Sequence, residues 1–193
     1  MKIILYGLNY APEQVGIGKY SGELANWLAS RGHNIRVITS QPYFPTWKIR
    51  KEYANRFTIE KTNGVYIIRC PLWVPQRPSG LTRLIHLASF ALSSLPIVLA
   101  QLRWKPDVVI AVAPAFFCTH SALMLAALCG RHTSTWLHIQ DFELDAAFEL
   151  GLLKGKLLRK IAESWERHTF RGFDRVSSIS TAMVQRLKVK GVN

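Results

Sequence analysis

The stretch LYGLNYAPEQVGIGKYSGELANWL, at residues 5–28, says most about the fold of this chain. Its first residues continue an apolar run that predicts a buried strand over residues 2–8. Its second half carries apolar residues at helical spacing and predicts an amphipathic helix over residues 19–30. Two glycines, Gly16 and Gly18, lie between the two elements. The stretch therefore predicts a strand, a glycine-containing turn and a helix.

Strand and helix signals go on alternating along the rest of the chain. Further strands are predicted at residues 35–40, 105–114, 133–141 and 174–180, and helices at residues 81–103, 115–130, 152–170 and 181–191, the last of them capped by Thr181. The dipeptide Asn63-Gly64 between two β-type runs predicts a hairpin. This order predicts one α/β domain, with a Rossmann-like, mostly parallel β-sheet flanked by helices on both faces.

The chain is strongly basic, with a net charge of +13 and an isoelectric point near 10.1. Residues 31–105 carry 12 basic and 2 acidic side chains, whereas residues 106–153 carry 1 basic and 5 acidic ones. Such a balance is typical of proteins that bind nucleic acid, an anionic membrane surface or a phosphorylated ligand.

Three cysteines, Cys70, Cys118 and Cys129, lie in apolar runs without C-x-x-C spacing. An odd number in this setting indicates reduced core residues of a cytoplasmic protein rather than disulfides or a zinc site. The N-terminus lacks the apolar region and cleavage site of a signal peptide. We therefore expect a cytoplasmic location.

Backbone N–H groups of a glycine turn at a helix N-terminus can bind phosphate. The dinucleotide fingerprint does not fit, because seven residues separate Leu8 from Gly16 and the third glycine is displaced to Gly22. The second predicted strand also ends without the acidic residue that would hold a ribose. The glycines either approach another phosphate ligand or only permit the turn.

Four motifs follow one another along the chain, namely YAPEQVGIGKYSGELANWLASRGHNIRVIT, KPDVVIAVAP, WLHIQDFELD and FDRVSSISTAMVQRLKVKGV. Their order and spacing resemble bacterial family 4 glycosyltransferases, and most closely the colanic-acid and exopolysaccharide fucosyltransferase-like group. The resemblance implies the two-domain GT-B architecture, with residues 1–193 as the N-terminal, acceptor-side domain. The donor-binding C-terminal domain is then a partner that this chain does not contain.

The resemblance also implies donor-phosphate and catalytic residues. The backbone of Gly16 and Gly18 approaches the donor phosphates, and Lys19 is a further candidate. Many relatives have a histidine directly before the position of Asp141, where this chain has Gln140. Either His138 or Asp141 is therefore the expected catalytic group, unless His138 is a hydrogen-bonded core residue.

Acceptor-binding candidates follow two predicted strand ends. Tyr43, Phe44 and Trp47 either stack on sugar rings or polyprenyl tails, or pack on one another. Glu143 either binds acceptor hydroxyls or opens the following helix.

A membrane hypothesis comes from the uncharged run over residues 84–102. Arg83, Arg103 and Lys105 bracket this run, and we expect them to dock the chain peripherally on the inner face of the cytoplasmic membrane by contacting anionic lipid. The alternative is a buried helix in a soluble domain.

Two functions follow from these patterns. The first is retaining, metal-independent and cofactor-independent transfer from a nucleotide-diphosphate sugar to a polyprenyl-linked saccharide in exopolysaccharide biosynthesis, as the resemblance implies. The second is a basic, non-catalytic nucleic-acid-binding module. The second is disfavoured because apolar helices interrupt the basic segments and no helix-turn-helix, zinc-finger or RNP-type pattern is present.

Overall fold

The computed structural model describes residues 1–113, 116–142, 148 and 155–192. The strands are β1 (Lys2–Gly7), β2 (Asn34–Ser40), β3 (Thr58–Thr62), β4 (Val65–Cys70), β5 (Val108–Ala113), β6 (Ser134–Ile139) and β7 (Arg175–Ser178). The helices are α1 (Gly16–Ser30), α2 (Gly80–Ala100), the 3-10 turn η1 (Gln101–Arg103), α3 (Phe116–Cys129), α5 (Lys156–Arg171) and α6 (Thr181–Val189).

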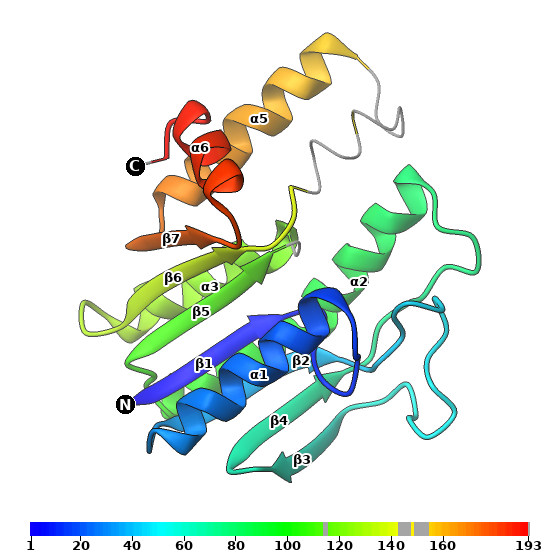
Figure 1. Ribbon diagram of the computed structural model, residues 1–193, viewed down its shortest axis with the longest axis vertical. Coiled ribbons are helices and arrows are strands. Elements are labelled where there is room, and N and C mark those ends of the chain that lie inside the picture. Colours follow the sequence, from blue (N-terminus) through cyan, green and yellow to red (C-terminus); the bar gives the residue numbers. More distant parts are fainter. Residues whose placement is uncertain (114–115, 143–147, 149–154, 193) are drawn as a thin grey trace.

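The strands form one sheet in the order β3-β4-β2-β1-β5-β6-β7 (Figure 1). All neighbours pair in parallel except β3 and β4, which form the antiparallel hairpin predicted at Asn63-Gly64. The carboxyl ends of the parallel strands therefore share one edge of the sheet, where open α/β folds bind their ligands.

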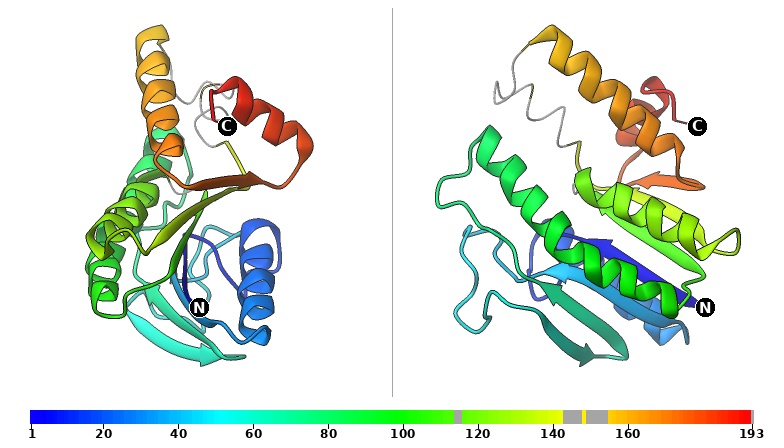
Figure 2. Two further views of the ribbon diagram at one scale, coloured as in Figure 1. Left: turned by 90° about the vertical axis from the view of Figure 1, so that its left-hand side faces the viewer. Right: turned by 180° about the vertical axis from the view of Figure 1, so that it is seen from behind.

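Helices cover both faces of the sheet (Figure 2). Successive residues of β1 point to opposite faces, so that Ile3 and Leu5 pack in one apolar cluster while Ile4 and Tyr6 pack in another. The first cluster includes residues of α1, and the second includes residues of α2 and α3. The predicted Rossmann-like α/β fold is confirmed.

Helix α1 begins at Gly16, three residues earlier than predicted, because the glycines belong to its first turns. A Cβ atom on Gly18 would lie 2.6 Å from Cβ of Glu13, and one on Gly22 would lie 2.9 Å from Cβ of Ala11. These two glycines let α1 pack closely on the loop before it. A Cβ atom on Gly16 would meet nothing within 4 Å, but its φ of +57° is a conformation that favours glycine.

The N-terminal cap of helix α6 also differs from the one that the sequence predicted. The cap is Ser180, whose Oγ accepts a hydrogen bond from the N–H of Met183 at 3.2 Å. The prediction of Thr181 as the cap was wrong by one residue, because serine and threonine are both favourable caps and stand side by side.

The apolar run predicted at residues 81–103 forms α2 and η1. By length and composition alone the segment Gly80–Arg103 could cross a membrane, with a mean hydropathy of 1.6. One face of α2 packs in the core through Leu87, Phe90 and Val98. The outer side chains include Leu81, Ile85 and Leu92, which are 69%, 47% and 71% exposed.

Candidate functional site

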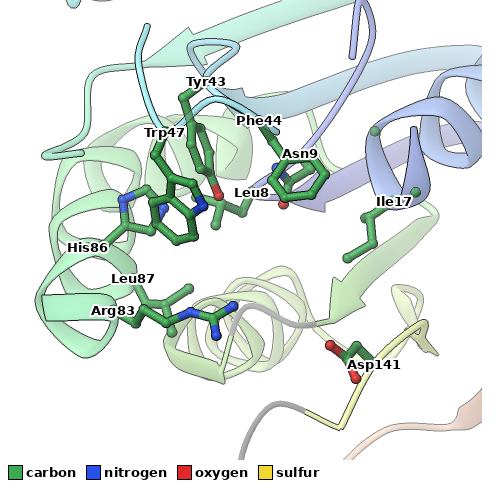
Figure 3. A pocket seen from close by; sticks show the side chains of 12 residues that line it. Leu8, Asn9, Ile17, Tyr43, Phe44, Trp47, Arg83, His86, Leu87 and Asp141 are labelled. Carbon is green, nitrogen blue, oxygen red and sulfur yellow. The ribbon is translucent and has the colours of Figure 1, made fainter. Parts of the chain in front are cut away.

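A pocket opens at the carboxyl edge of the sheet, where β1 passes into the loop before α1 (Figure 3). It is lined by Leu8, Asn9, Gly16, Ile17, Gly18, Tyr43, Phe44, Trp47, Arg83, His86, Leu87 and Asp141. The wall comes from the end of β1, the first turn of α1, the loop after β2, the start of α2 and the segment after β6.

This pocket unites most of the predicted site residues. The donor-phosphate and acceptor candidates that line it are Gly16, Gly18, Tyr43, Phe44 and Trp47. Asp141, a catalytic candidate, lies across the pocket from the aromatic side chains (Figure 3). Arg83, predicted to contact a membrane, lies in the same wall.

Other predicted residues lie elsewhere. Lys19 is outside the pocket wall as the described residues define it, and its exposed side chain approaches Glu23 at 3.9 Å. Arg103 and Lys105 are exposed beyond the far end of α2, about 30 Å from Arg83 for a helix of this length. Glu143 lies outside the described residues.

The first turn of α1 contributes backbone N–H groups to the pocket. Gly16, Ile17 and Gly18 line the wall, and the N-cap residue Val15 makes no side-chain capping bond. The first N–H groups of a helix have no acceptor within the helix, and the helix dipole makes this end positive. This part of the wall can therefore bind an anion such as a phosphate.

Glu13 holds the two loops of the pocket together. Its side chain is buried, and its Oε1 accepts hydrogen bonds from the N–H groups of Tyr43 and Phe44 at 3.1 and 3.0 Å. Its Oε2 accepts from Nδ2 of Asn9 at 3.0 Å. Burial raises the pKa of Glu13, although these hydrogen bonds lower it in part. No sequence motif singled out Glu13, although it is the only charged residue in residues 3–18.

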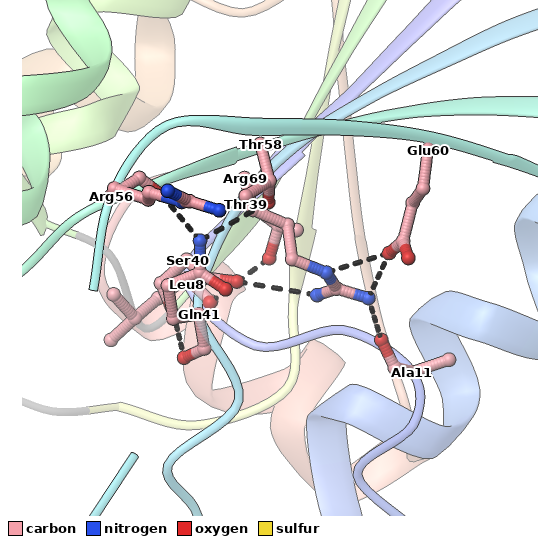
Figure 4. A network of polar contacts seen from close by, with 9 residues as sticks. All are labelled: Leu8, Ala11, Thr39, Ser40, Gln41, Arg56, Thr58, Glu60 and Arg69. Carbon is pink, nitrogen blue, oxygen red and sulfur yellow. Dashed lines mark hydrogen bonds and ion pairs between the residues drawn. The ribbon is translucent and has the colours of Figure 1, made fainter. Parts of the chain in front are cut away.

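Arg69 makes a second set of contacts behind the same loops (Figure 4). Its Nε donates to Glu60 at 2.7 Å, and its two terminal nitrogens donate to the carbonyl oxygens of Ala11 and Ser40 at 2.6 and 3.3 Å. The side chain is only 3% exposed. Arg69 therefore joins the loop before α1, the end of β2 and the β3–β4 hairpin.

His86 lies among the aromatic side chains of the pocket wall. Its ring meets Tyr43 edge-on at a centroid distance of 4.6 Å and lies 5.3 Å from the ring of Trp47. The guanidinium of Arg83, one helical turn away, lies 5.6 Å from the ring centroid of Trp47. Burial lowers the pKa of His86, and the charge of Arg83 lowers it further, while a hydrogen bond to Trp73 raises it in part.

His138 lies on β6 and does not line the pocket as the described residues define it. Its Nδ1 is 2.9 Å from Oγ of Ser177, which also accepts a hydrogen bond from Nε1 of Trp136 at 2.7 Å. Burial lowers the pKa of His138. Because the indole N–H can only donate, Nδ1 of His138 is the acceptor that the described contacts offer to the Ser177 hydroxyl. The neutral imidazole then carries its proton on Nε2.

The arrangement suits a ligand that combines a sugar ring with an anionic group. Aromatic faces stack on the apolar faces of rings, the start of α1 attracts anions, and Asp141 can accept hydrogen bonds from hydroxyls. Among the residues that the structure describes, no group of three or more His, Cys, Asp and Glu side chains could hold a metal ion.

Comparison with known proteins gives a consistent assignment. Residues 15–193 match the family described as "Glycosyl transferase 4-like domain". The chain is 46% identical over 195 residues to the "Putative colanic acid biosynthesis glycosyl transferase WcaI" of Escherichia coli (strain K12). That match covers 100% of this chain and 47% of the relative, so the chain spans about half the length of the curated relative.

Solved structures show the same fold at low sequence identity. Sucrose-phosphate synthase from Thermosynechococcus elongatus matches 98% of this chain and 45% of its own, with 12% identity and a TM-score of 0.65. The catalytic domain of starch synthase IV from Arabidopsis thaliana, bound to ADP and acarbose, matches 74% of this chain and 34% of its own, with 16% identity and a TM-score of 0.55. The family match covers nearly the whole described domain, and the chain belongs to the glycosyl transferase 4-like domain family of glycosyltransferases.

Proposed function

We propose that this chain is the acceptor-side half of a glycosyltransferase of exopolysaccharide biosynthesis. In this proposal a nucleotide-diphosphate sugar supplies the transferred sugar, and a polyprenyl-linked saccharide accepts it. The observation that carries the proposal is the pocket, which brings the first turn of α1 and the aromatic loop after β2 to one place. The 46% identity to the E. coli colanic acid protein supports a role in exopolysaccharide biosynthesis.

The donor diphosphate is proposed to meet the start of α1. The N–H groups of Gly16 and Gly18 would stabilise the charge that develops on the leaving diphosphate, as preorganised donors do. Lys19 is a weaker candidate, because its exposed side chain lies beside Glu23. Transfer with retention, without metal and without a cofactor, is part of the proposal and rests on the resemblance.

The catalytic group is proposed to be Asp141 or His138. Asp141 faces the pocket and can position an acceptor hydroxyl or the transferred sugar (Figure 3). His138 would act differently, because the contact with Ser177 leaves Nε2–H as a hydrogen-bond donor. A second domain that supplies the donor sugar is proposed to complete the cleft over both residues.

Membrane association is proposed to bring the lipid-linked acceptor to this pocket. The exposed Leu81 and Ile85 lie at the pocket end of α2, beside Arg83, whereas Arg103 and Lys105 lie at the other end. Vesicle co-sedimentation tests which end docks. Leu81→Ser with Ile85→Ser should reduce binding to anionic vesicles more than Arg103→Gln with Lys105→Gln, and equal binding to neutral and anionic vesicles would contradict electrostatic docking.

A chimera tests the proposed function directly. This chain replaces the matching 47% of E. coli WcaI in a strain that lacks WcaI, and colanic acid is measured. We expect polysaccharide synthesis to be restored, and Asp141→Asn in the chimera to reduce it. A folded, expressed chimera that makes no colanic acid would contradict the proposal. The nucleic-acid alternative predicts salt-sensitive binding of duplex DNA by the isolated chain instead.

A further inference from the structure

One polar atom in the pocket wall has no hydrogen-bond partner among the residues that the structure describes. This atom is Nε2 of His86, and it is buried. The residue itself is 1% exposed. Leaving a buried acceptor unsatisfied is costly, so this nitrogen calls for a hydrogen-bond donor from a ligand or from a water molecule.

The other ring nitrogen determines the chemistry of this atom. Nδ1 of His86 is 2.6 Å from the carbonyl oxygen of Trp73, and a carbonyl can only accept. Nδ1 therefore carries the proton. Since burial and the charge of Arg83 lower the pKa of His86, the ring is neutral at pH 7 and Nε2 presents a lone pair.

The surroundings of this lone pair define what can reach it. The ring of His86 contacts Tyr43 and Trp47 in the pocket wall (Figure 3). Trp47 is only partly buried and lies between the exposed residues Thr46 and Lys48. Of the two rings that contact His86, Trp47 is therefore the one that solvent reaches, and a ligand that enters beside Trp47 approaches the His86 ring.

We propose that Nε2 of His86 accepts a hydrogen bond from a hydroxyl group of the saccharide bound in this pocket. The ligand class is a sugar that stacks one face on Trp47 and presents a hydroxyl at the edge of that face, where it satisfies the buried nitrogen. This role rests on the proposed function, because it places the acceptor saccharide in the same pocket. It adds a specificity residue on α2, which the sequence patterns did not single out.

Nitrogen NMR of the chain labelled with ¹⁵N-histidine tests the proposal. The probes are methyl β-D-galactopyranoside, methyl β-D-glucopyranoside and methyl α-L-fucopyranoside, with 2-methoxytetrahydropyran as a ring that has no hydroxyl. The free chain should show His86 protonated on Nδ1 only. At least one glycoside should shift the Nε2 resonance upfield, and the hydroxyl-free ring should not.

Two outcomes of the titration overturn the proposal. The first is a glycoside that moves the indole N–H resonance of Trp47 while Nε2 of His86 stays unchanged, as a trapped water at Nε2 would predict. The second is the absence of binding by every glycoside.

A pair of variants separates recognition from folding. His86→Asn keeps a donor for the Trp73 carbonyl, because Nδ2 can take the place of Nδ1, and it removes Nε2, because the amide oxygen Oδ1 then takes the place of a ring carbon closer to the backbone. It should therefore weaken glycoside affinity about tenfold while the chain stays folded. The matched control is Ser89→Ala, which removes the 2.9 Å bond from the Trp73 N–H and the 2.7 Å bond to the backbone carbonyl of His86. This change leaves the His86 ring in place and should leave affinity unchanged. Full affinity in His86→Asn would overturn the proposal.

The chimera distinguishes this inference from the proposed function. A chimera that restores colanic acid equally well with and without the His86→Asn substitution contradicts the role of His86 alone. A chimera that makes no polysaccharide contradicts the proposed function, and an Nε2 shift with glycosides then still supports saccharide binding at this site.

Discussion

Arg69 and His86 are both buried polar side chains near the carboxyl edge of the sheet, and their contacts differ in kind. Each guanidinium nitrogen of Arg69 has an acceptor from another part of the chain. His86 has one nitrogen bonded to Trp73 and one without a described partner. A fully bonded group stabilises the loops around it, whereas an unsatisfied acceptor is available to a ligand. The contrast assigns Arg69 to stability and His86 to recognition.

The largest expected effect is loss of stability in Arg69→Met. The substitution leaves the carbonyls of Ala11 and Ser40 and one oxygen of Glu60 without their donor, and breaking a buried ion pair typically costs about 3–5 kcal/mol. Glu60 is 37% exposed, so we expect a loss near the lower value, measured by urea unfolding. The exposed Arg77→Met is the control. A loss below about 1 kcal/mol would remove the contrast with His86, since Arg69 would then not hold the loops.

The next largest effect is expected for Glu13→Ala, which should destabilise the chain by about 2 kcal/mol. The substitution removes the acceptor of three hydrogen-bond donors, on Asn9, Tyr43 and Phe44. The aromatic loop should also become mobile, so glycoside binding should fall with stability. Glu23→Ala, which removes only an exposed contact, is the control in the same unfolding measurement. Unchanged loop dynamics in Glu13→Ala would contradict the coupling.

Two glycine substitutions separate packing from backbone strain. Gly18→Ala places a Cβ 2.6 Å from Cβ of Glu13 and should cost about 1–3 kcal/mol through overpacking. Gly16→Ala meets no neighbour within 4 Å and should cost about 1–2 kcal/mol, because alanine disfavours a φ of +57°. Gly16→Asn should recover part of that loss in the same unfolding measurement, since asparagine tolerates this region better. Equal losses for Ala and Asn at position 16 would contradict the strain argument.

A smaller effect is expected for Ser177→Ala, which should cost about 1 kcal/mol. The change removes the hydroxyl that meets Nδ1 of His138, so the tautomer of His138 should become mixed in ¹⁵N NMR spectra. Ser178→Ala is the matched control, because Ser178 lies next to Ser177 on β7 and its hydroxyl donates a 2.7 Å hydrogen bond to the carbonyl of Ile139 on β6. An unaltered tautomer in Ser177→Ala would show that Ser177 does not orient His138.

The smallest effect is the pH dependence of stability. The folded-state pKa values of His86 and His138 are lowered below the ordinary value by burial, so their contribution is present above about pH 6.5 and is lost as the pH falls through the folded values. The raised pKa of Glu13 has the opposite effect, because the folded chain then binds this proton more readily and gains stability as the pH falls toward the range in which carboxyl groups titrate. Urea unfolding at about pH 7.5 and at about pH 5.5 should therefore show a small loss of stability at the lower pH, and His86→Asn should reduce that loss. A flat profile would contradict the burial argument.

Local patterns in the sequence were enough to predict the order of strands and helices, the α/β class and the family resemblance. These features depend on periodicity, glycine and proline positions and motif order, which are readable without knowing the path of the chain. The hairpin at Asn63-Gly64 is an example, because the turn dipeptide and the flanking β-type residues are adjacent. The same local patterns predicted a start of α1 three residues too late, because glycines are typical of turns and Gly16 and Gly18 were assigned to the loop before the helix.

The contacts between side chains, in contrast, became visible only in the folded chain. Glu13 reaches Tyr43 across 30 residues, Arg69 reaches Ala11 across 58, and His138 reaches Ser177 across 39. The same chain path put Arg83 into the pocket and left Arg103 at the far end of α2. Such contacts depend on strand order and helix packing, which bring distant segments to one edge of the sheet and have no signature in local sequence.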